Sequence, residues 1–181
     1  MTEQLNFIEN QHKIKSIIKK IIKQNKQVVH GARAINAQVS WPYQRETKDY
    51  DIFSNKKAGK AARNMERALD KGVGGDFFYT KKGITKGVFK VFDKGFDQKR
   101  DTPDDSLIAD YMKKPKGVQS KKIEGIKYRT LADIKKSKIA LVNNPQFEHR
   151  KKKDLEDIRT INVFLKTKGR KKKWRRGHKA D

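Results

Sequence analysis

The segment TKDYDIF at residues 47–53 places two aspartates one position apart between strand-forming side chains. Residues two positions apart in a β-strand point to the same face, so Asp49 and Asp51 are expected to project side by side. Carboxylates held this close repel each other unless a divalent cation lies between them, and oxygen ligands suit Mg²⁺ or Mn²⁺. The pattern therefore indicates metal-dependent phosphoryl or nucleotidyl transfer. The simpler alternative is an exposed edge strand with polar alternate positions.

A short apolar run precedes this segment. The run Val28-Val29-His30 stops at Gly31, and the residues that follow have good helix propensity, which predicts a strand, a tight turn and a helix. Backbone N–H groups at such a turn can hold a phosphate, and glycine lets a ligand approach the main chain closely. An ordinary strand-to-helix connection is the alternative.

Together these features resemble the nucleotidyltransferase superfamily typified by DNA polymerase beta. In that family a strand ends in glycine and a small residue, a helix follows, and the next strand carries an acidic-apolar-acidic pattern. Gly31 and Ala32 occupy the first position here, and Asp49 and Asp51 occupy the second. The family prefers Gly-Gly or Gly-Ser at the turn, and residues 38–46 of this chain look like an insertion before the acidic strand.

The resemblance implies a third carboxylate from a later strand. The run SLIADY at residues 106–111 fits, because it reads as a core strand that ends by delivering Asp110. By resemblance, Asp49 and Asp51 would share two Mg²⁺ or Mn²⁺ ions, and Asp110 would complete the ion on the nucleophile side. Gly31 and Ala32 would seat the triphosphate of a bound nucleotide.

A second resemblance covers residues 123–158, where a hairpin leads into helices, as in small nucleotidyltransferases of viral or toxin-like type. The last helix carries RKKKDLEDI at residues 150–158, similar to a recurring R-x-K-D-x-x-D-I pattern. Arg150 or Lys153 would then clamp the triphosphate, although a solvated helix face also explains these cations. Arg33 is a further candidate contact for the nucleotide's anionic oxygens, with an exposed helix residue as its alternative.

Composition excludes several classes of protein. A chain of 181 residues forms one domain, and the absence of cysteine excludes disulfides, zinc–thiolate sites and thiol nucleophiles. The four histidines show no metal-ligand spacing. No apolar run reaches membrane-spanning length, and the N-terminus does not resemble a signal peptide. The sequence therefore predicts a soluble intracellular protein without membrane contacts.

The formal net charge of +25 predicts a polyanionic partner, RNA or DNA, because self-repulsion of this order disfavours the compact state. Association with nucleic acid or with a virion would relieve it. Residues 166–181 carry the densest basic charge and are expected to be disordered when free. The candidate nucleic-acid-binding residues in this tail are Lys171, Lys172, Lys173, Trp174, Arg175 and Arg176. A localisation signal or a solubilising tail are the alternatives.

The expected fold class is α+β, with a nucleotidyltransferase-like mixed sheet, flanking helices and a basic C-terminal tail. Residues 1–27 form an amphipathic helix with a stripe of isoleucines, residues 28–165 form the nucleotidyltransferase-like domain, and residues 166–181 form the tail. Within the domain we expect a helix at residues 56–71 that ends at Gly72, followed by strands at residues 77–80, 87–92 and 107–111.

The sequence thus predicts an enzyme, a nucleotidyltransferase that moves a nucleotide from a nucleoside triphosphate to a hydroxyl acceptor on nucleic acid. Two alternatives stay open. One is a nucleic-acid-binding or packaging protein that keeps this fold but has lost catalysis. The other is a toxin-type nucleotidyltransferase that modifies tRNA or protein.

Overall fold

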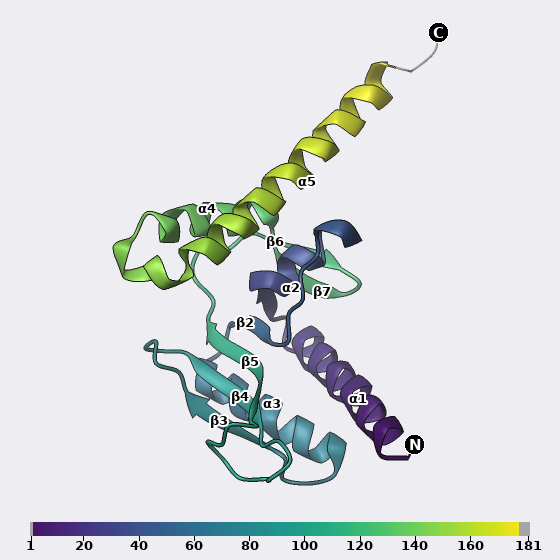
Figure 1. Ribbon diagram of the computed structural model, residues 1–181, viewed down its shortest axis with the longest axis vertical. Coiled ribbons are helices and arrows are strands. Elements are labelled where there is room, and N and C mark those ends of the chain that lie inside the picture. Colours follow the sequence, from purple (N-terminus) through teal and green to yellow (C-terminus); the bar gives the residue numbers. More distant parts are fainter. Residues whose placement is uncertain (1, 178–181) are drawn as a thin grey trace.

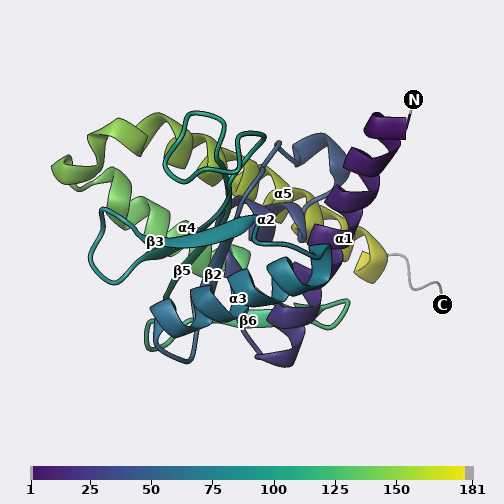
Figure 2. The same cartoon turned by 90° about the horizontal axis from the view of Figure 1, so that it is seen from below.

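A computed structural model describes the backbone of residues 2–177 and the side chains of residues 10–167. It contains a mixed sheet of seven strands in the order β3-β4-β5-β2-β1-β7-β6, with helices against both faces (Figures 1 and 2). In chain order the elements are α1 (Thr2–Gln24), β1 (Val28–His30), α2 (Gly31–Asn36), η1 (Trp41–Tyr43), β2 (Tyr50–Ser54), α3 (Ala58–Val73), β3 (Phe78–Lys82), β4 (Phe89–Asp93), β5 (Ser106–Lys113), β6 (Ser120–Ile123), β7 (Ile126–Arg129), α4 (Leu131–Val142), η2 (Pro145–Arg150) and α5 (Lys151–Gly177).

The centre of the sheet positions two of the predicted acids. Strands β2 and β5 are parallel neighbours, and Asp51 lies directly opposite Asp110 in their register. The sequence predicts Asp110 at the end of a strand. In the structure Asp110 lies inside β5, because residues 111–113 continue to pair with residues 52–54. Strand β1 runs antiparallel to β2 on its other side. The two carboxylates therefore come from the most constrained part of the sheet.

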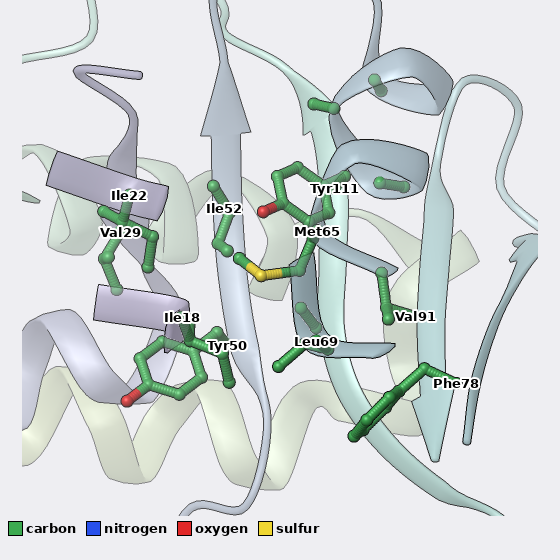
Figure 3. Packing of buried hydrophobic residues seen from close by; sticks show 14 of the residues in the cluster. Ile18, Ile22, Val29, Tyr50, Ile52, Met65, Leu69, Phe78, Val91 and Tyr111 are labelled. Atoms are coloured by element: carbon green, nitrogen blue, oxygen red, sulfur yellow. The ribbon is translucent and has the colours of Figure 1, made fainter. Parts of the chain in front are cut away.

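One face of the sheet packs against α1 and α3. Ile14, Ile18 and Ile22 lie at four-residue spacing, so they share one face of α1, and all three are buried. They belong to the same core as Met65 and Leu69 of α3 and the apolar residues of the central strands (Figure 3). The isoleucine stripe of the N-terminal helix is thus an integral part of the domain core.

On the other face of the sheet, α2 contacts β1 and β2, and α4 and α5 pack against α2 and against each other (Figure 2). Its smaller core contains Ile35 of α2, Leu131 and Ile134 of α4, and Ile161 and Phe164 of α5. Because side chains alternate along a strand, Ile52 enters the larger core while its neighbour Asp51 points toward this second layer. The acidic residues therefore face the helices that carry most of the predicted phosphate-binding cations.

Helix α3 ends two residues later than predicted. Gly72 remains helical and lies against α1, where an added Cβ would come within 2.2 Å of Ile17 Cδ1. Gly74 terminates the helix instead, since its φ of 95° is the left-handed conformation that glycine adopts without strain. The sequence correctly predicts that a glycine ends this helix. Which of the two glycines ends it depends on packing against α1, which a local pattern does not show.

Helix α5 remains helical as far as Gly177 and projects from the domain (Figure 1), whereas the sequence predicts a disordered tail from residue 166. Lysine and arginine have high helix propensity, and a segment that extends an existing helix avoids the cost of nucleation. The candidate nucleic-acid contacts at residues 171–176 have side chains outside the described part of the chain, so their role stays a prediction. Of the helices described, none combines the length and apolar character needed to cross a bilayer.

Candidate active site

Three carboxylates form what we call the acidic wall: Asp49, Asp51 and Asp110. Asp51 and Asp110 come from adjacent strands, and Asp49 lies directly before β2. One oxygen from each carboxylate lies within 4.8 Å of the others. Among the side chains of residues 10–167, this is the one group of acidic or imidazole ligands close enough together to hold a metal ion. The structure therefore brings all three predicted acids to a single point.

The acidic wall concentrates negative charge that the protein does not fully compensate. Burial raises the pKa of Asp51 to about 6, and the charges of Asp49 and Asp110 add to the rise. Burial also raises the pKa of Asp110, although Lys90 opposes the shift from 3.7 Å away. The buried Oδ1 of Asp110 accepts no hydrogen bond from the described residues. An oxygen-only cluster with these properties fits Mg²⁺ or Mn²⁺.

Gly31 makes the acidic wall possible. Its φ is +62°, and a Cβ built on it would lie 1.8 Å from Asp51 Oδ2 and 3.2 Å from Asp51 Cβ. The glycine therefore gives room to a carboxylate of the next strand. Its predicted role, to let a ligand approach the main chain, stays a prediction. Gly31 and Ala32 both line the pocket in front of the carboxylates.

Arg33 positions the segment directly before β2, residues 46–49, which we call the acidic loop. Its Nε donates to the carbonyl oxygen of Asp49 at 2.6 Å, and its Nη2 donates to that of Lys48 at 2.7 Å. The guanidinium also lies 3.8 Å from the ring centroid of Tyr50. The segment before β2 has no strand partner for these carbonyl groups, so a fixed donor satisfies them. Arg33 is absent from the lining of the carboxylate pocket, which differs from its predicted contact with the nucleotide.

The pocket in front of the carboxylates has a volume of about 640 Å³. The same pocket is lined by cations from residues 38–46, α4, the end of η2 and the start of α5, which we call the basic wall: Arg45, Lys138, Arg150 and Lys153. Lys90 and His149 also line the pocket. The predicted cations Arg150 and Lys153 therefore lie in the same pocket as the predicted acids.

A buried charge network of Arg45, Lys138, Arg150, Asp154 and Asp157 supports the basic wall. Lys138 Nζ lies 2.5 Å from Asp154 Oδ1 and 2.8 Å from Asp157 Oδ2. Arg150 Nε lies 2.8 Å from Asp154 Oδ2, and Arg45 Nε lies 3.0 Å from Asp157 Oδ1. The side chains of Asp154 and Asp157 are only 0% and 3% exposed. Each cation is thus held by at least one buried carboxylate.

The electrostatics of the network favour its ionised form. Burial opposes the ionisation of Asp154, but hydrogen bonds from Arg150 and Lys138 outweigh it and hold the pKa of this carboxyl below its usual range. Buried aspartates require such partners, because an unpaired charge in the interior is costly. Three cations share two carboxylates, so the network presents net positive charge to the pocket.

Sequence reasoning missed Arg45, Lys90, Lys138 and His149. Asp154 and Asp157 are three residues apart and therefore lie on one face of α5, which could have signalled buried carboxylates in need of cations. Nothing in the sequence around Lys138 identifies its partners, because it is one of several lysines in α4 and they differ only in tertiary position.

Neither a protein-family model nor a curated protein matches this sequence. Several solved structures are similar in fold, and they include the following two. The polyadenylate synthase of Megavirus superposes with a TM-score of 0.66 and 16% sequence identity, over 87% of this chain and 32% of that one. JHP933 from Helicobacter pylori superposes with a TM-score of 0.51 and 19% identity, over 87% of this chain and 65% of that one.

These similarities confirm the predicted fold class. The chain has an α+β, nucleotidyltransferase-like fold, with a mixed sheet flanked by helices. It spans 32% of the length of the Megavirus protein and 65% of the length of the Helicobacter protein, less than two thirds of either. At these identities the likeness concerns the fold, and the chemistry has to be argued from the residues of the pocket.

Proposed function

We propose that this protein is a metal-dependent nucleotidyltransferase that moves a nucleotide from a nucleoside triphosphate to a hydroxyl group on RNA or DNA. One observation carries the proposal: the acidic wall and the basic wall face the same pocket of about 640 Å³. The acids suit a divalent cation and the cations suit a polyphosphate, so the pocket has separate places for the two charged parts of a metal–triphosphate complex.

The acidic wall is the place for Mg²⁺ or Mn²⁺. Asp49, Asp51 and Asp110 offer oxygen ligands within 4.8 Å of one another. Burial and then the charges of Asp49 and Asp110 raise the pKa of Asp51, and a bound cation would favour its ionised form. When bound, the ion supplies Lewis-acid polarisation and neutralises developing negative charge. Arg33 and Gly31 contribute indirectly, since Arg33 fixes the backbone before β2 and Gly31 leaves space for the Asp51 carboxylate.

The basic wall is the place for the triphosphate. Lys153 and Arg150 line the pocket and lie close enough to Asp51 for their charges to oppose the rise in its pKa. Lys138 and Arg45 line the same wall and are held by buried carboxylates, so they need little reorganisation when an anion arrives. These cations would bind the phosphate oxygens and neutralise the charge that builds up on the departing pyrophosphate.

Two further observations support the class of reaction and the acceptor. The Megavirus protein that shares this fold is a polyadenylate synthase, which supports nucleotide transfer by this chain. The net charge of +25 supports a polyanionic acceptor, because basic side chains release counterions from phosphates when they bind nucleic acid.

Incubation with each labelled nucleoside triphosphate, an RNA or DNA oligonucleotide and Mg²⁺ or Mn²⁺ tests the proposal. We expect a labelled, lengthened oligonucleotide that requires the metal and disappears in Asp51→Asn, which removes one charge with little change in volume. Absence of transfer to any acceptor, or equal transfer by wild type and Asp51→Asn, would contradict the proposed function.

A further inference from the structure

A second cavity, of about 680 Å³, lies on the other side of the acidic loop. It shares with the first cavity the loop residues Glu46, Thr47, Lys48 and Asp49, together with Leu107. Asp49 is therefore common to the two cavities, whereas the cations of the basic wall line the first one only. The acidic wall thus has a separate approach that the proposed triphosphate site does not use.

The walls of the second cavity come from α1, Arg33 of α2, the acidic loop and the start of β5. Gln11 and Lys15 of α1 face residues 105–108 across it. Asp105 is already engaged, because its carboxylate accepts hydrogen bonds from the hydroxyl of Tyr79 and the backbone N–H of Thr102. Lys15 is exposed and forms no ion pair with the described side chains, so its charge is available to a ligand.

The lining of this cavity is balanced in charge, with Lys15, Arg33 and Lys48 against Glu46, Asp49 and Asp105, and the excess of positive charge lies farther along α1. Residues 10–24 contain five lysines and no acidic residue. Lys15, Lys19 and Lys23 follow Gln11 at four-residue spacing and therefore share a side of the helix, over a rise of about 18 Å from Gln11. All five lysines are exposed. The lysines form a long, narrow row, which matches the line of phosphates along a nucleic-acid strand.

We propose that the second cavity receives the end of a single nucleic-acid strand, whose phosphates lie along the lysines of α1 and whose terminal hydroxyl reaches Asp49. This inference rests on the proposed nucleotidyl transfer and assigns its acceptor site. The triphosphate occupies the first cavity and the acceptor occupies the second, so the two reactants approach the acidic wall from opposite sides of the loop. Such an arrangement keeps two polyanions apart except at the carboxylate site.

The first test measures binding of fluorescent RNA and DNA oligonucleotides by the full chain as salt is varied. We expect the double variant Lys15→Glu and Lys19→Glu to lose affinity by roughly tenfold or more and to show a flatter salt dependence, by about 0.7 in log–log slope per lost contact. The matched control is the double variant Lys116→Glu and Lys136→Glu, which makes the same change in charge at two exposed lysines that line neither cavity. Equal affinities for the double variant and wild type, or an equal loss in the control, would overturn the assignment.

The second test locates the end of the strand. Because the chain has no cysteine, Gln11→Cys supplies a single thiol at the mouth of the second cavity. An oligonucleotide with an activated pyridyl disulfide at its 3′ end should react with this thiol and release pyridinethiol at least about tenfold faster than with the thiol of Lys136→Cys. Equal rates for the two thiols would overturn the proposal. An acidic peptide that carries the same pyridyl disulfide and reacts with the Gln11→Cys thiol as fast as the oligonucleotide does would also overturn it.

The failure of this inference and the failure of the proposed function give different results. Metal and triphosphate should raise the melting temperature of the Lys15→Glu and Lys19→Glu variant as much as that of wild type, since the first cavity is intact. If neither protein responds to metal and triphosphate, the proposed function fails. If both respond but the oligonucleotide results show no dependence on α1, only the acceptor site is wrong.

Discussion

The acidic wall and the basic wall line one pocket, but they are held in place by different means. The three carboxylates of the acidic wall are fixed by strand register and by the backbone contacts of Arg33, and they remain short of compensating charge. Three of the four cations of the basic wall are fixed by buried carboxylates that satisfy them. The acidic wall is thus left with uncompensated charge, while three cations of the basic wall are paired with carboxylates of the interior.

This difference predicts how each wall responds to mutation. Removing a carboxylate from the acidic wall should harm chemistry and spare the fold, because the carboxylates repel one another when no metal is bound. Removing a carboxylate from the buried charge network should harm the fold itself, because the buried Lys138 then loses one of its two partners and an arginine loses its own. The following predictions test this contrast, beginning with the largest expected effect.

The largest effect is expected for Asp51→Asn. Loss of this ligand should lower metal-dependent transfer by about a thousandfold or more, because a bound ion contributes several kcal/mol of charge stabilisation. The melting temperature of the metal-free protein at pH 7 should be equal to or higher than that of wild type. Initial rates with labelled triphosphate and thermal denaturation measure the two quantities. A variant that unfolds more easily than wild type would contradict the contrast between the walls.

The second prediction concerns Asp154→Asn in the buried charge network. The substitution removes one of the two carboxylates that hold the buried Lys138 and the carboxylate that holds the partly exposed Arg150, so the free energy of unfolding should fall by about 3 kcal/mol. Chemical denaturation measures the loss. The matched control is Glu148→Gln, which removes an exposed ion pair with Lys151 and should cost about 0–1 kcal/mol. Similar losses for the two variants would mean that the network adds nothing beyond surface charge.

The third prediction follows from the pKa of Asp51, which burial and its acidic neighbours raise to about 6 from the usual value of 3.8. Between these values the folded state binds more protons than the unfolded state, so the stability of the metal-free protein should fall as the pH rises from about 4 to 6. The contribution of Asp51 is on the order of 2–3 kcal/mol. It should vanish in Asp51→Asn and shrink when Mg²⁺ or Mn²⁺ is present. A pH dependence that is the same with and without Asp51 would be incompatible with this assignment.

The smallest effect compares two glycines with positive φ. Gly31→Ala and Gly74→Ala both force a side chain into the left-handed region, at about 1–2 kcal/mol each. A Cβ at Gly74 meets nothing within 4 Å, whereas a Cβ at Gly31 overlaps the Asp51 carboxylate. Only Gly31→Ala should therefore abolish the rise in melting temperature caused by Mn²⁺. Loss of the metal response in both variants would show that backbone strain alone disturbs the site.

The sequence by itself determined the local parts of this protein. The alternation in TKDYDIF placed Asp49 and Asp51 on one side of a strand, and the stop at Gly31 marked the turn from β1 to α2. The apolar stripe of residues 14–22 identified the buried face of α1. Each of these features depends on residues only a few positions apart, where the geometry of strands and helices fixes which side chains are neighbours.

Only the tertiary structure decided how these parts meet. Arg33 reaches the carbonyl groups of residues 47–49, and Lys138 reaches Asp154 and Asp157 on another helix. The position of Asp110 opposite Asp51 depends on the pairing of β2 with β5, two strands far apart in the sequence. A lysine or arginine has the same local preferences whether it contacts solvent, a carbonyl group or a buried carboxylate. Its partner is therefore set by the packing of distant elements, and no local pattern in this chain could reveal it.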